Sequence, residues 1–450
     1  MHILTTDPLF AWDKLPDSPC LAIVRQALEL LPDEKLLAAL QAHRGHGRND
    51  YPLHVLWRVH VVQYVLRHPT MEACLGELER NPALRKVVGL EEGCAIPSAW
   101  NMSRFVAVLG RPEHHPLHRQ VFMELGQRLA GVVPDLGEHV AGDSAALSAR
   151  ADSDGGEGTL PQPCPGRKEY HDEAGNLAKV YEWFGYKFHL MVDTKHEVAL
   201  GYRLTGATAS DALQIPQVLQ DVLAILPAGR IMTLAYDKAA DDLKTHELLH
   251  TKKIKPLIQN RCLWKEQSEQ LLPGHDGRSN VVYDEAGTIY CYDKVSAVPC
   301  KRKMAYIGYE KSRRTLKYRC PARHEGWPCP SDKKCNGQSK YGKTVRVKCA
   351  LDLRRFPPIP RATQEFQRRY KGRSASERVN ARVKLFWGAD DGNVTGAARF
   401  HAHMGTIMIV HIALANLLAM APRHEGKSLS PVRLSVIAKR LRRAADLKDT

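Results

Sequence analysis

The chain has 450 residues, of which 44% are hydrophobic and 25% are charged. These proportions are typical of a globular protein with one large core or two to three smaller ones, and give no sign of a disordered or fibrous chain. Lys and Arg number 65 against 49 Asp and Glu, a net charge of +16. This surplus favours a polyanionic partner, although charge alone does not identify it.

Signals for export or membrane insertion are weak. Residues 1–15 have no basic stretch followed by an apolar stretch, so we expect no secretory signal. The longest apolar run, residues 405–421, is interrupted by His411 and Asn416 and predicts a buried helix and no membrane contact. Eleven cysteines without an export signal favour a cytoplasmic protein with reduced thiols or a metal site.

Residues 1–125 are predicted to be helical. Apolar residues recur at helical intervals after Pro52, and further short helices are predicted to begin near Thr70, Pro82 and Ser98. Short helices joined by tight turns are compatible with helix-turn-helix DNA binding. They are equally compatible with a plain bundle that serves packing or dimer contacts.

From about residue 138 the pattern indicates strands alternating with helices. Residues 138–147 predict a strand that contains Asp143, and the short apolar run 231–236 predicts a buried strand that ends at Asp237. Residues 149–176 are polar and are predicted to be a loop or flap. The remaining predicted elements are a hairpin at 186–193 and 198–205, helices at 210–226 and 241–250, and a strand at 254–258.

This order predicts an α/β fold, a mixed sheet covered by helices on both faces. In such a sheet Asp143 and Asp237 would lie on neighbouring strands. Each has a structural alternative, because Asp143 could be a turn residue and Asp237 could cap the following helix. Asp193, Asp241 and Asp242 are nearby acids that could be mistaken for site residues, and Asp242 is the best substitute for Asp237.

The segment YKGRSASERVNARVK, residues 370–384, carries polar side chains at regular spacing. In a helix, Tyr370, Arg373, Glu377 and Lys384 would share one face. A lone carboxylate would thus be presented among an aromatic ring and two cations.

The surroundings of this segment bear on its role. Val379, Val383 and Phe386 recur on roughly the opposite face and are expected to pack on a core. Between Arg361 and Lys384 there are eight basic residues against two acidic ones, which favours contact with a phosphate backbone. The alternative is a capping box, in which Ser374 and Glu377 only fix a helix start.

The spacing Tyr-x2-Arg-x3-Glu-x6-Lys resembles the signature around the last catalytic acid of the DDE transposases of bacterial insertion sequences, and all four positions match. The segments GYKFHLMVD (185–193) and AYDKAADD (235–242) resemble the second-strand and second-aspartate segments of that class. The helical N-terminal region is similar to the domain that precedes its catalytic core. The resemblance therefore extends over most of the chain.

The resemblance implies an RNase H-like core in which Asp143, Asp237 and Glu377 hold two Mg²⁺ (or Mn²⁺) ions, with Asp143 bridging both. Water would release a 3′ hydroxyl at the element end, and that hydroxyl would attack target DNA. Tyr370, Arg373 and Lys384 would contact phosphates or a displaced base beside the cut.

The implied partners are double-stranded DNA and a second copy of the chain, as a homodimer on paired ends in the nucleoid. Two alternatives remain. One is a nuclease of the same fold that cuts without joining, and the other is a catalytically inactive DNA-binding regulator.

An insertion, residues 261–355, separates the strands from the Glu377 segment. A hairpin is predicted at 281–292. From Cys300 to Lys348 there are fifteen basic and three acidic residues, so most of the net charge lies here. We expect DNA contact, and a solvated loop is the alternative.

The insertion also contains six cysteines: Cys291, Cys300, Cys320, Cys329, Cys335 and Cys349. Four thiolates could close a zinc site in an insertion with little core of its own. The first candidates are Cys320, Cys329 and Cys335. Because their spacing is irregular and no CxxC pair is present, free or buried thiols are the favoured alternative.

The predicted organisation is a helical domain at 1–125, a catalytic core at 138–260 and 356–422, the basic insertion at 261–355, and a basic tail at 423–450. The core is expected to end in a long helix at 397–420. Residues 434–446 form a basic amphipathic stretch in the tail, which could contact DNA or be a solvated end.

Overall fold

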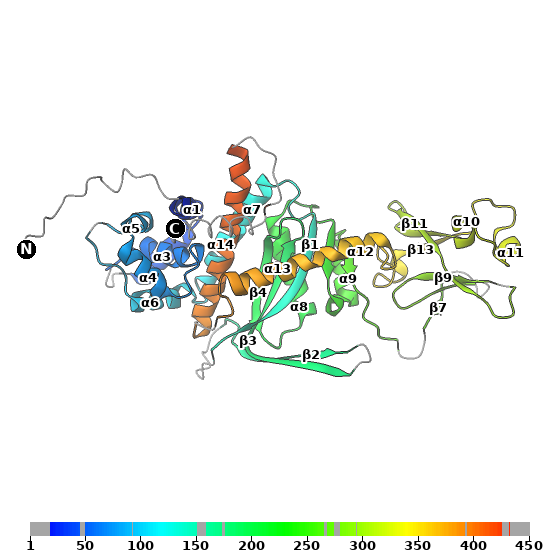
Figure 1. Ribbon diagram of the computed structural model, residues 1–450, viewed down its shortest axis with the longest axis horizontal. Coiled ribbons are helices and arrows are strands. Elements are labelled where there is room, and N and C mark those ends of the chain that lie inside the picture. The colour runs from blue at the N-terminus through cyan, green and yellow to red at the C-terminus, as the bar shows by residue number, and fades with distance from the viewer. Residues whose placement is uncertain are drawn as a thin grey trace, which may run out of the picture.

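The computed structural model describes residues 19–45, 50–91, 93–150, 159–172, 176–264, 268–273, 280–293, 295–391, 394–424 and 432. The described chain forms an elongated molecule with a helical end, a central sheet and two small sheets at the opposite end (Figure 1). The predicted amphipathic stretch at 434–446 and the residues 1–15 considered for a signal lie outside the described residues.

The N-terminal part is helical, as predicted. Its helices are α1 (Pro19–Glu29), α2 (Glu34–Arg44), α3 (Leu53–Val65), α4 (Met71–Arg80), α5 (Pro82–Val88), α6 (Ala99–Leu109) and α7 (His115–Val132). Thr70 and Ser98 cap α4 and α6 by accepting hydrogen bonds from backbone N–H groups of the first turn. Helix α3 is apolar on most of its surface because other helices surround it.

The last helix, α14 (Ala397–His424), packs against α7, α6, α3 and α1, so the end of the chain closes the bundle formed by its beginning. By length and composition its Ala397–Met420 portion could cross a membrane, but 83% of its most apolar window is buried inside the protein. The predicted buried helix is confirmed. Its apolar side chains belong to one hydrophobic cluster that continues from the helical end into the central sheet.

The central sheet is mixed, as predicted. Its strands are β1 (His139–Ser148), β2 (Cys164–His171), β3 (Leu177–Asp193), β4 (Ala199–Gly206), β5 (Thr233–Tyr236) and β6 (Lys255–Ile258). The order is β2-β3-β1-β5-β6, with β4 also paired to β3. Strands β1, β5 and β6 are parallel to one another, whereas β3 is antiparallel to β1, β2 and β4.

Helices pack against this sheet. Helix α8 (Asp211–Ile225) packs on β3 and β4, and α9 (Leu243–Thr251) packs beside β6. Helices α12 (Gln364–Tyr370) and α13 (Ser374–Ala381) run as one rod across the sheet (Figure 1). They contact β6, β1 and β3, which brings the Glu377 segment over the strands that carry the two aspartates.

The loop predicted at residues 149–176 is wrong in part. Residues 164–171 form β2, which pairs with an extension of β3 that begins at Leu177, and together they project as a long hairpin (Figure 1). Both strands of this hairpin are largely exposed, so they have no apolar face of period two. The usual sequence signal for a strand is therefore weak here.

The insertion folds into two small sheets. One has the order β10-β9-β8-β7 and the other β11-β12-β13. Their strands are β7 (Gln270–Leu271), β8 (Val281–Tyr283), β9 (Ile289–Tyr292), β10 (Lys301–Lys303), β11 (Ala305–Glu310), β12 (Thr315–Arg319) and β13 (Thr344–Lys348). Two short helices, α10 (Pro321–Glu325) and α11 (Asp332–Asn336), lie between β12 and β13.

The predicted hairpin at 281–292 is confirmed as β8–β9. The expectation of little core is wrong, because the insertion has its own hydrophobic cluster, which includes Val281, Ile289, Leu316, Val345 and Val347. These residues occur singly or in pairs in strands of a few residues, among many basic side chains. A small core of this kind becomes visible only when the strands are brought together.

Candidate active site

The pairing of β1 with β5 places two acids side by side. The parallel register joins Val140 to Leu234 and Ala141 to Ala235, and continuing it by two residues places Asp143 beside Asp237. Gly142 is required here, because a Cβ at this position would lie 2.1 Å from the ring of Tyr236. The predicted neighbourhood of the two aspartates is therefore observed, and Asp143 lies within a strand and not in a turn.

The third acid reaches the same place from α13. Arg373 lies between the acids, with its NH1 atom 3.9 Å from Asp143 Oδ2 and its NH2 atom 2.5 Å from Glu377 Oε1. Glu377 is about half exposed, whereas the Asp143 side chain is 20% exposed. Carboxylates from β1 and α13 thus pair with one guanidinium, and Asp237, at the end of β5, lies beside Asp143.

The ionisation of Asp143 reflects this crowding. The pKa of Asp143 is raised to about 6, chiefly by burial and also by the Asp237 and Glu377 carboxylates, against the opposing effects of the Ser144 N–H and Arg373. Like charges held this close need a compensating cation. The structure supplies Arg373 as one, and the donor set of three carboxylates is what Mg²⁺ or Mn²⁺ binds.

Tyr370 and Lys384 lie on different sides of this cluster. The Tyr370 ring stacks on Phe366 at 5.6 Å, and burial raises the pKa of its hydroxyl, with Asp237 and Glu377 adding to the effect. The Lys384 ammonium donates to the Ala146 carbonyl and pairs with Asp390, both at 2.8 Å. Lys384 is thus held further along β1, three residues beyond Asp143.

The helix over the acids is not regular, which separates Lys384 from the other three side chains. A 3₁₀ turn (Lys371–Arg373) precedes α13, and a π turn (Arg382–Phe386) follows it. The alternative of a capping box is not observed, because Ser374 donates to the Lys371 carbonyl and Glu377 pairs with Arg373. The apolar side is confirmed, because Val379 and Val383 are fully buried and Phe386 packs on the core.

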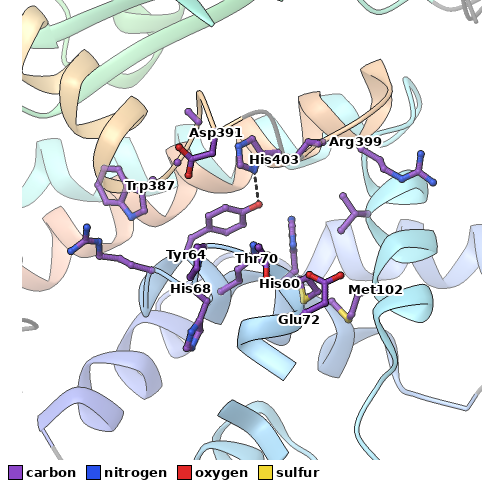
Figure 2. Close-up of a pocket in the computed structure, with 18 of the residues that line it drawn as sticks. His60, Tyr64, His68, Thr70, Glu72, Met102, Trp387, Asp391, Arg399 and His403 are labelled. Atoms are coloured by element: carbon purple, nitrogen blue, oxygen red, sulfur yellow. Dashed lines mark hydrogen bonds between the residues drawn. The ribbon is translucent and has the colours of Figure 1, made fainter. Parts of the chain in front are cut away.

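A separate cavity of about 570 Å³ lies between the N-terminal helices and the segment that follows α13 (Figure 2). In this cavity the Tyr64 hydroxyl lies 2.7 Å from His403 Nδ1. Burial lowers the pKa of His60 to about 3 and that of His403 to about 4, so both imidazoles are neutral at pH 7. None of the three acids lines this cavity.

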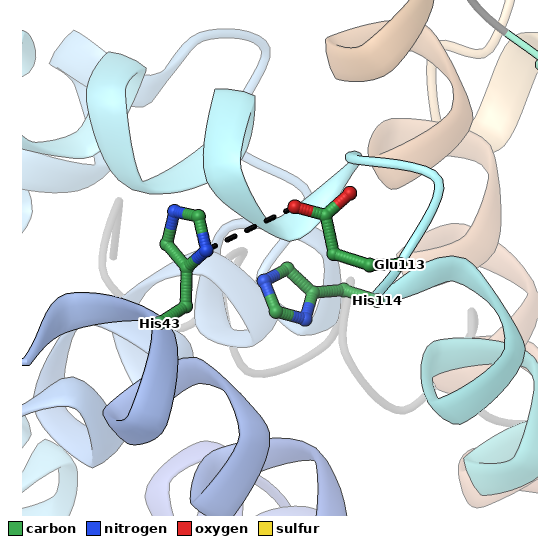
Figure 3. A group of neighbouring side chains, drawn as sticks. All are labelled: His43, Glu113 and His114. Carbon is green, nitrogen blue, oxygen red and sulfur yellow. Dashed lines mark ion pairs between the residues drawn. The ribbon is translucent and has the colours of Figure 1, made fainter.

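His43, Glu113 and His114 form a second cluster of titratable groups (Figure 3). Within the described ranges, this is the group of three whose donor atoms all lie within 4.8 Å of one another. However, Arg111 NH1 lies 2.9 Å from His43 Nε2 and 3.9 Å from Glu113 Oε1. Because a guanidinium already provides the positive charge, we assign no metal here.

The nearby acids have structural roles. Buried Asp193 accepts hydrogen bonds from the N–H groups of Gly137, Lys195 and His196, and Asp242 caps α9 through Thr245. Asp237 also accepts a hydrogen bond from Ala239 N, at 2.9 Å, but it remains partly exposed beside Asp143. Asp242 therefore does not replace Asp237 in the cluster.

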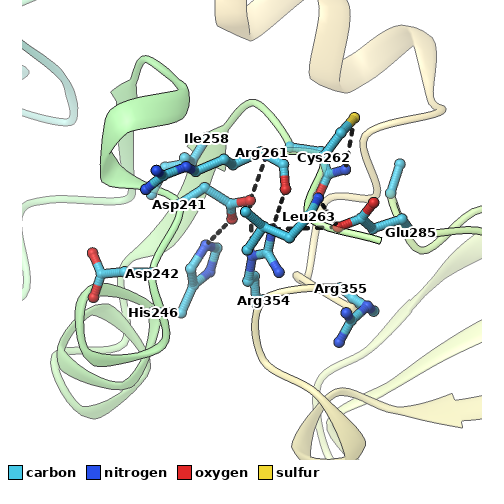
Figure 4. A network of polar contacts seen from close by, with 12 residues as sticks. Asp241, Asp242, His246, Ile258, Arg261, Cys262, Leu263, Glu285, Arg354 and Arg355 are labelled. Atoms are coloured by element: carbon cyan, nitrogen blue, oxygen red, sulfur yellow. Dashed lines mark hydrogen bonds and ion pairs between the residues drawn. The ribbon is translucent and has the colours of Figure 1, made fainter. Parts of the chain in front are cut away.

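Asp241 joins the insertion to the core (Figure 4). Its buried carboxylate accepts from Arg354 Nε at 2.9 Å, Arg361 NH2 at 3.0 Å and the Arg261 N–H at 2.7 Å, and His246 Nε2 lies 3.0 Å away. Both ends of the insertion thus converge on one side chain. Burial raises the pKa of Asp241, but the His246 hydrogen bond, the Arg261 N–H and the two arginines together hold it below its usual range.

A groove of about 1150 Å³ begins at Ser144, the residue after Asp143. The β2–β3 hairpin supplies one wall, where the rings of Tyr181 and Trp183 stack at 5.6 Å. The cations that line the groove are Arg167, Lys168, Lys187 and Lys384. The hairpin residues were not predicted from the sequence, because residues 149–176 were predicted to be a loop or flap and residues 177–185 were assigned to no element. The available signal was the spacing of Tyr181 and Trp183, two residues apart, which places both rings on one face of a strand.

Family comparisons agree with this geometry. A family model described as a transposase DDE domain matches residues 161–413, and one described as a transposase domain matches residues 13–107. Among solved structures, a cryo-EM structure of the piggyBac transposase synaptic complex with hairpin DNA is similar over 94% of this chain and 78% of that chain, with 10% identity and a TM-score of 0.39. A TM-score this low supports no argument from that structure. The DDE-domain match covers more than half of the chain and includes Asp237 and Glu377, so the chain belongs to the DDE transposases, as its signature predicted.

Proposed function

We propose that the chain cuts the ends of an insertion sequence and joins them to target DNA, with Asp143, Asp237 and Glu377 as its catalytic residues. The observation that carries this proposal is the convergence of these acids from β1, the end of β5 and α13, where Asp237 and Glu377 both act on Asp143 and Arg373 pairs with Asp143 and Glu377. A catalytically inactive regulator has no need to maintain such a costly cluster of like charges.

The carboxylates would hold two divalent ions, Mg²⁺ or Mn²⁺. These ions would activate an attacking water or 3′ hydroxyl and stabilise the leaving oxygen. The three carboxylates do not all lie within 4.8 Å of one another. They would each supply oxygen ligands from a different part of the fold, and carboxylate oxygens are the ligands that Mg²⁺ and Mn²⁺ prefer.

Arg373 has a second role in this proposal. In the structure it neutralises Asp143 and Glu377, and its remaining N–H donors suit a bidentate phosphate contact. When carboxylates are neutralised by metal, the guanidinium is free to turn toward the phosphate at the cut. Tyr370 lies beside Arg373 and would position the same phosphate or a displaced base.

Double-stranded DNA is the proposed partner, and the groove beside Asp143 is its proposed path. The cations of the groove match a phosphate backbone, and the Tyr181–Trp183 stack offers an aromatic surface to an unpaired base. The described chain carries one set of the three acids, and an element has two ends. We therefore infer a homodimer on paired ends, acting at the nucleoid in the cytoplasm.

The decisive variant is Glu377→Gln. It removes one metal-binding charge while keeping the shape of the side chain, so cleavage of a labelled element end in Mg²⁺ should fall by at least about 10³-fold, whereas end binding should change less than about threefold. The matched control is Glu365→Gln, an exposed acid that pairs with Arg369 on the same rod and should retain cleavage.

The products of the wild-type protein separate the three candidate functions. Joined product in a complex of two chains supports transposition. Cut product without joining would indicate a nuclease, and a DNA shift without cleavage in either metal would indicate a regulator. Normal cleavage by Glu377→Gln would remove that residue from the site.

A further inference from the structure

Five cysteines of the insertion line one cavity of about 200 Å³, and four of them are partly or fully buried. Cys291 lies on β9, Cys320 follows β12, Cys329 lies between the two short helices, and Cys335 is on α11. The cavity therefore lies where the four-stranded sheet, the three-stranded sheet and the α10–α11 segment meet.

The thiols are surrounded by polar groups. The Asn336 side-chain amide lies 3.5 Å from Cys320 Sγ, and that of Asn280 lies 3.9 Å from Cys335 Sγ. Lys343 lines the same cavity and hydrogen-bonds to Asn280. N–H donors directed at sulfur and a nearby cation stabilise metal-bound thiolates, and they are not needed by neutral thiols in an apolar core.

Three of these cysteines differ from the apolar thiols of the insertion, whereas Cys291 packs against its hydrophobic cluster. Cys349 belongs to the hydrophobic cluster of the insertion, as an apolar core residue does. Cys320, Cys329 and Cys335 are not members of that cluster, and neither are the residues of α10 and α11. Each of these helices has only five residues, so the segment that carries three thiols has little apolar packing to hold it in place.

The four thiols also affect one another. The pKa of Cys291 is raised to about 12, chiefly by burial and also by Cys320, Cys329 and Cys335, whereas Lys343 acts to lower it. Cys300 also lines the cavity, but it is exposed, whereas Cys320 is buried and the other three are partly buried. Exposure thus separates Cys300 from the group of four.

We propose that Cys291, Cys320, Cys329 and Cys335 bind one structural Zn²⁺ ion, which fastens the α10–α11 segment to β9 and links the two sheets of the insertion. Three of these residues were candidates from the sequence, and the fold supplies Cys291 as the fourth. No three of these four sulfur atoms all lie within 4.8 Å of one another, whereas thiolates on one zinc are about 3.8 Å apart. Zinc binding should therefore draw α11 toward β9, with loss of the thiol protons.

The test uses the full-length protein. Purified without chelator and with zinc in the growth medium, it should contain about one zinc per chain by elemental analysis. After exchange for Co²⁺ it should show thiolate-to-cobalt charge-transfer absorption and the visible bands of a tetrahedral site. Cys291→Ser and Cys335→Ser should each reduce the bound zinc severalfold, whereas Cys300→Ser and the exposed Cys262→Ser should retain it.

The cobalt spectrum of the wild-type protein tests for a thiolate site by itself, so the test remains valid if a serine variant fails to fold. A wild-type protein without stoichiometric zinc, or with the four cysteines paired as disulfides, would overturn the site. Full zinc in a folded Cys291→Ser variant would remove Cys291 as a ligand and overturn the four-thiol assignment. None of these measurements depends on DNA cleavage, so they stand apart from the test of the transposase function.

Discussion

Asp143 shows how a single side chain is prepared for metal binding. It follows Gly142, whose missing Cβ leaves room for the Tyr236 ring, and it lies mostly buried beside Asp237 and Arg373. Its pKa of about 6 is above the value of about 3.9 for an exposed aspartate. At neutral pH the folded protein without metal therefore holds an unfavourable charge.

The first prediction at this scale concerns the pH dependence of stability. A carboxyl whose pKa is raised by folding destabilises the fold progressively as pH rises from about 4 to about 6, and the cost remains above that range. In EDTA at pH 7.5, Asp143→Asn should therefore raise the free energy of unfolding by about 1–3 kcal/mol, and the gain should disappear near pH 4. Thermal unfolding at both pH values measures this.

Saturating Mg²⁺ should reverse the order, because only the wild-type site gains a bound cation. Asp242→Asn is a suitable control, since it alters a helix cap and should not be stabilising at any pH. A lower melting temperature for Asp143→Asn at pH 7.5 in EDTA would contradict the crowding of charges inferred here.

At the scale of elements, the insertion is attached to the core through Asp241. The Asp241 carboxylate accepts a hydrogen bond from the Arg261 N–H, where the chain enters the insertion. It also accepts from the side chains of Arg354 and Arg361, where the chain leaves the insertion. The arginines are buried almost completely. Removing the carboxylate would leave two buried cations without their main charge partner.

Asp241→Asn should accordingly lower the free energy of unfolding by about 3–5 kcal/mol, measured by chemical denaturation at pH 7. Because folding depresses the pKa of Asp241, its contribution is present above about pH 4 and is lost as pH falls through the lower folded value. Asp242→Ala, which removes only a helix cap, should cost about 1 kcal/mol. Equal effects of the two substitutions would argue against the junction.

At the scale of the whole molecule, positive charge is concentrated in two places. The first place is the part of the insertion from Cys300 to Lys348, which has twelve more basic than acidic residues, out of a net charge of +16 for the chain. The second place is the groove beside Asp143, with Arg167 and Lys168 on its exposed hairpin wall. The first gives the molecule a general attraction to DNA, whereas the second is placed next to the acids.

We predict that the double variant Arg167→Ala, Lys168→Ala binds element-end DNA more weakly. The slope of the logarithm of the binding constant against the logarithm of the salt concentration should become shallower by about two, because each lost phosphate contact changes it by about 0.9. Titration by fluorescence anisotropy at several salt concentrations measures this slope. Lys252→Ala, an exposed lysine that does not line the groove, is the control and should leave it unchanged. An unaltered slope in the double variant would place the DNA elsewhere.

The sequence alone determined the kinds of elements and the motif. Apolar periodicity and capping residues identified the helices at α3, α4 and α6 and the strands that carry Asp143 and Asp237, because these signals are local. The Tyr370–Lys384 signature identified the family before any fold was available. Apolar periodicity is missing where a strand is exposed on both faces, as β2 is. It is also missing where core residues are scattered among basic ones, as in the insertion.

Tertiary structure decided which acids meet. The sequence alone does not distinguish four aspartates of the same chemistry: Asp193, Asp237, Asp241 and Asp242. Strand register shows that Asp237 lies beside Asp143, and hydrogen-bond partners show that the other three cap or join elements. In the same way only the pairing of β9 with its neighbours brings Cys291 to the other thiols. The physical reason is that these contacts span tens to hundreds of residues, so they depend on packing and not on local periodicity.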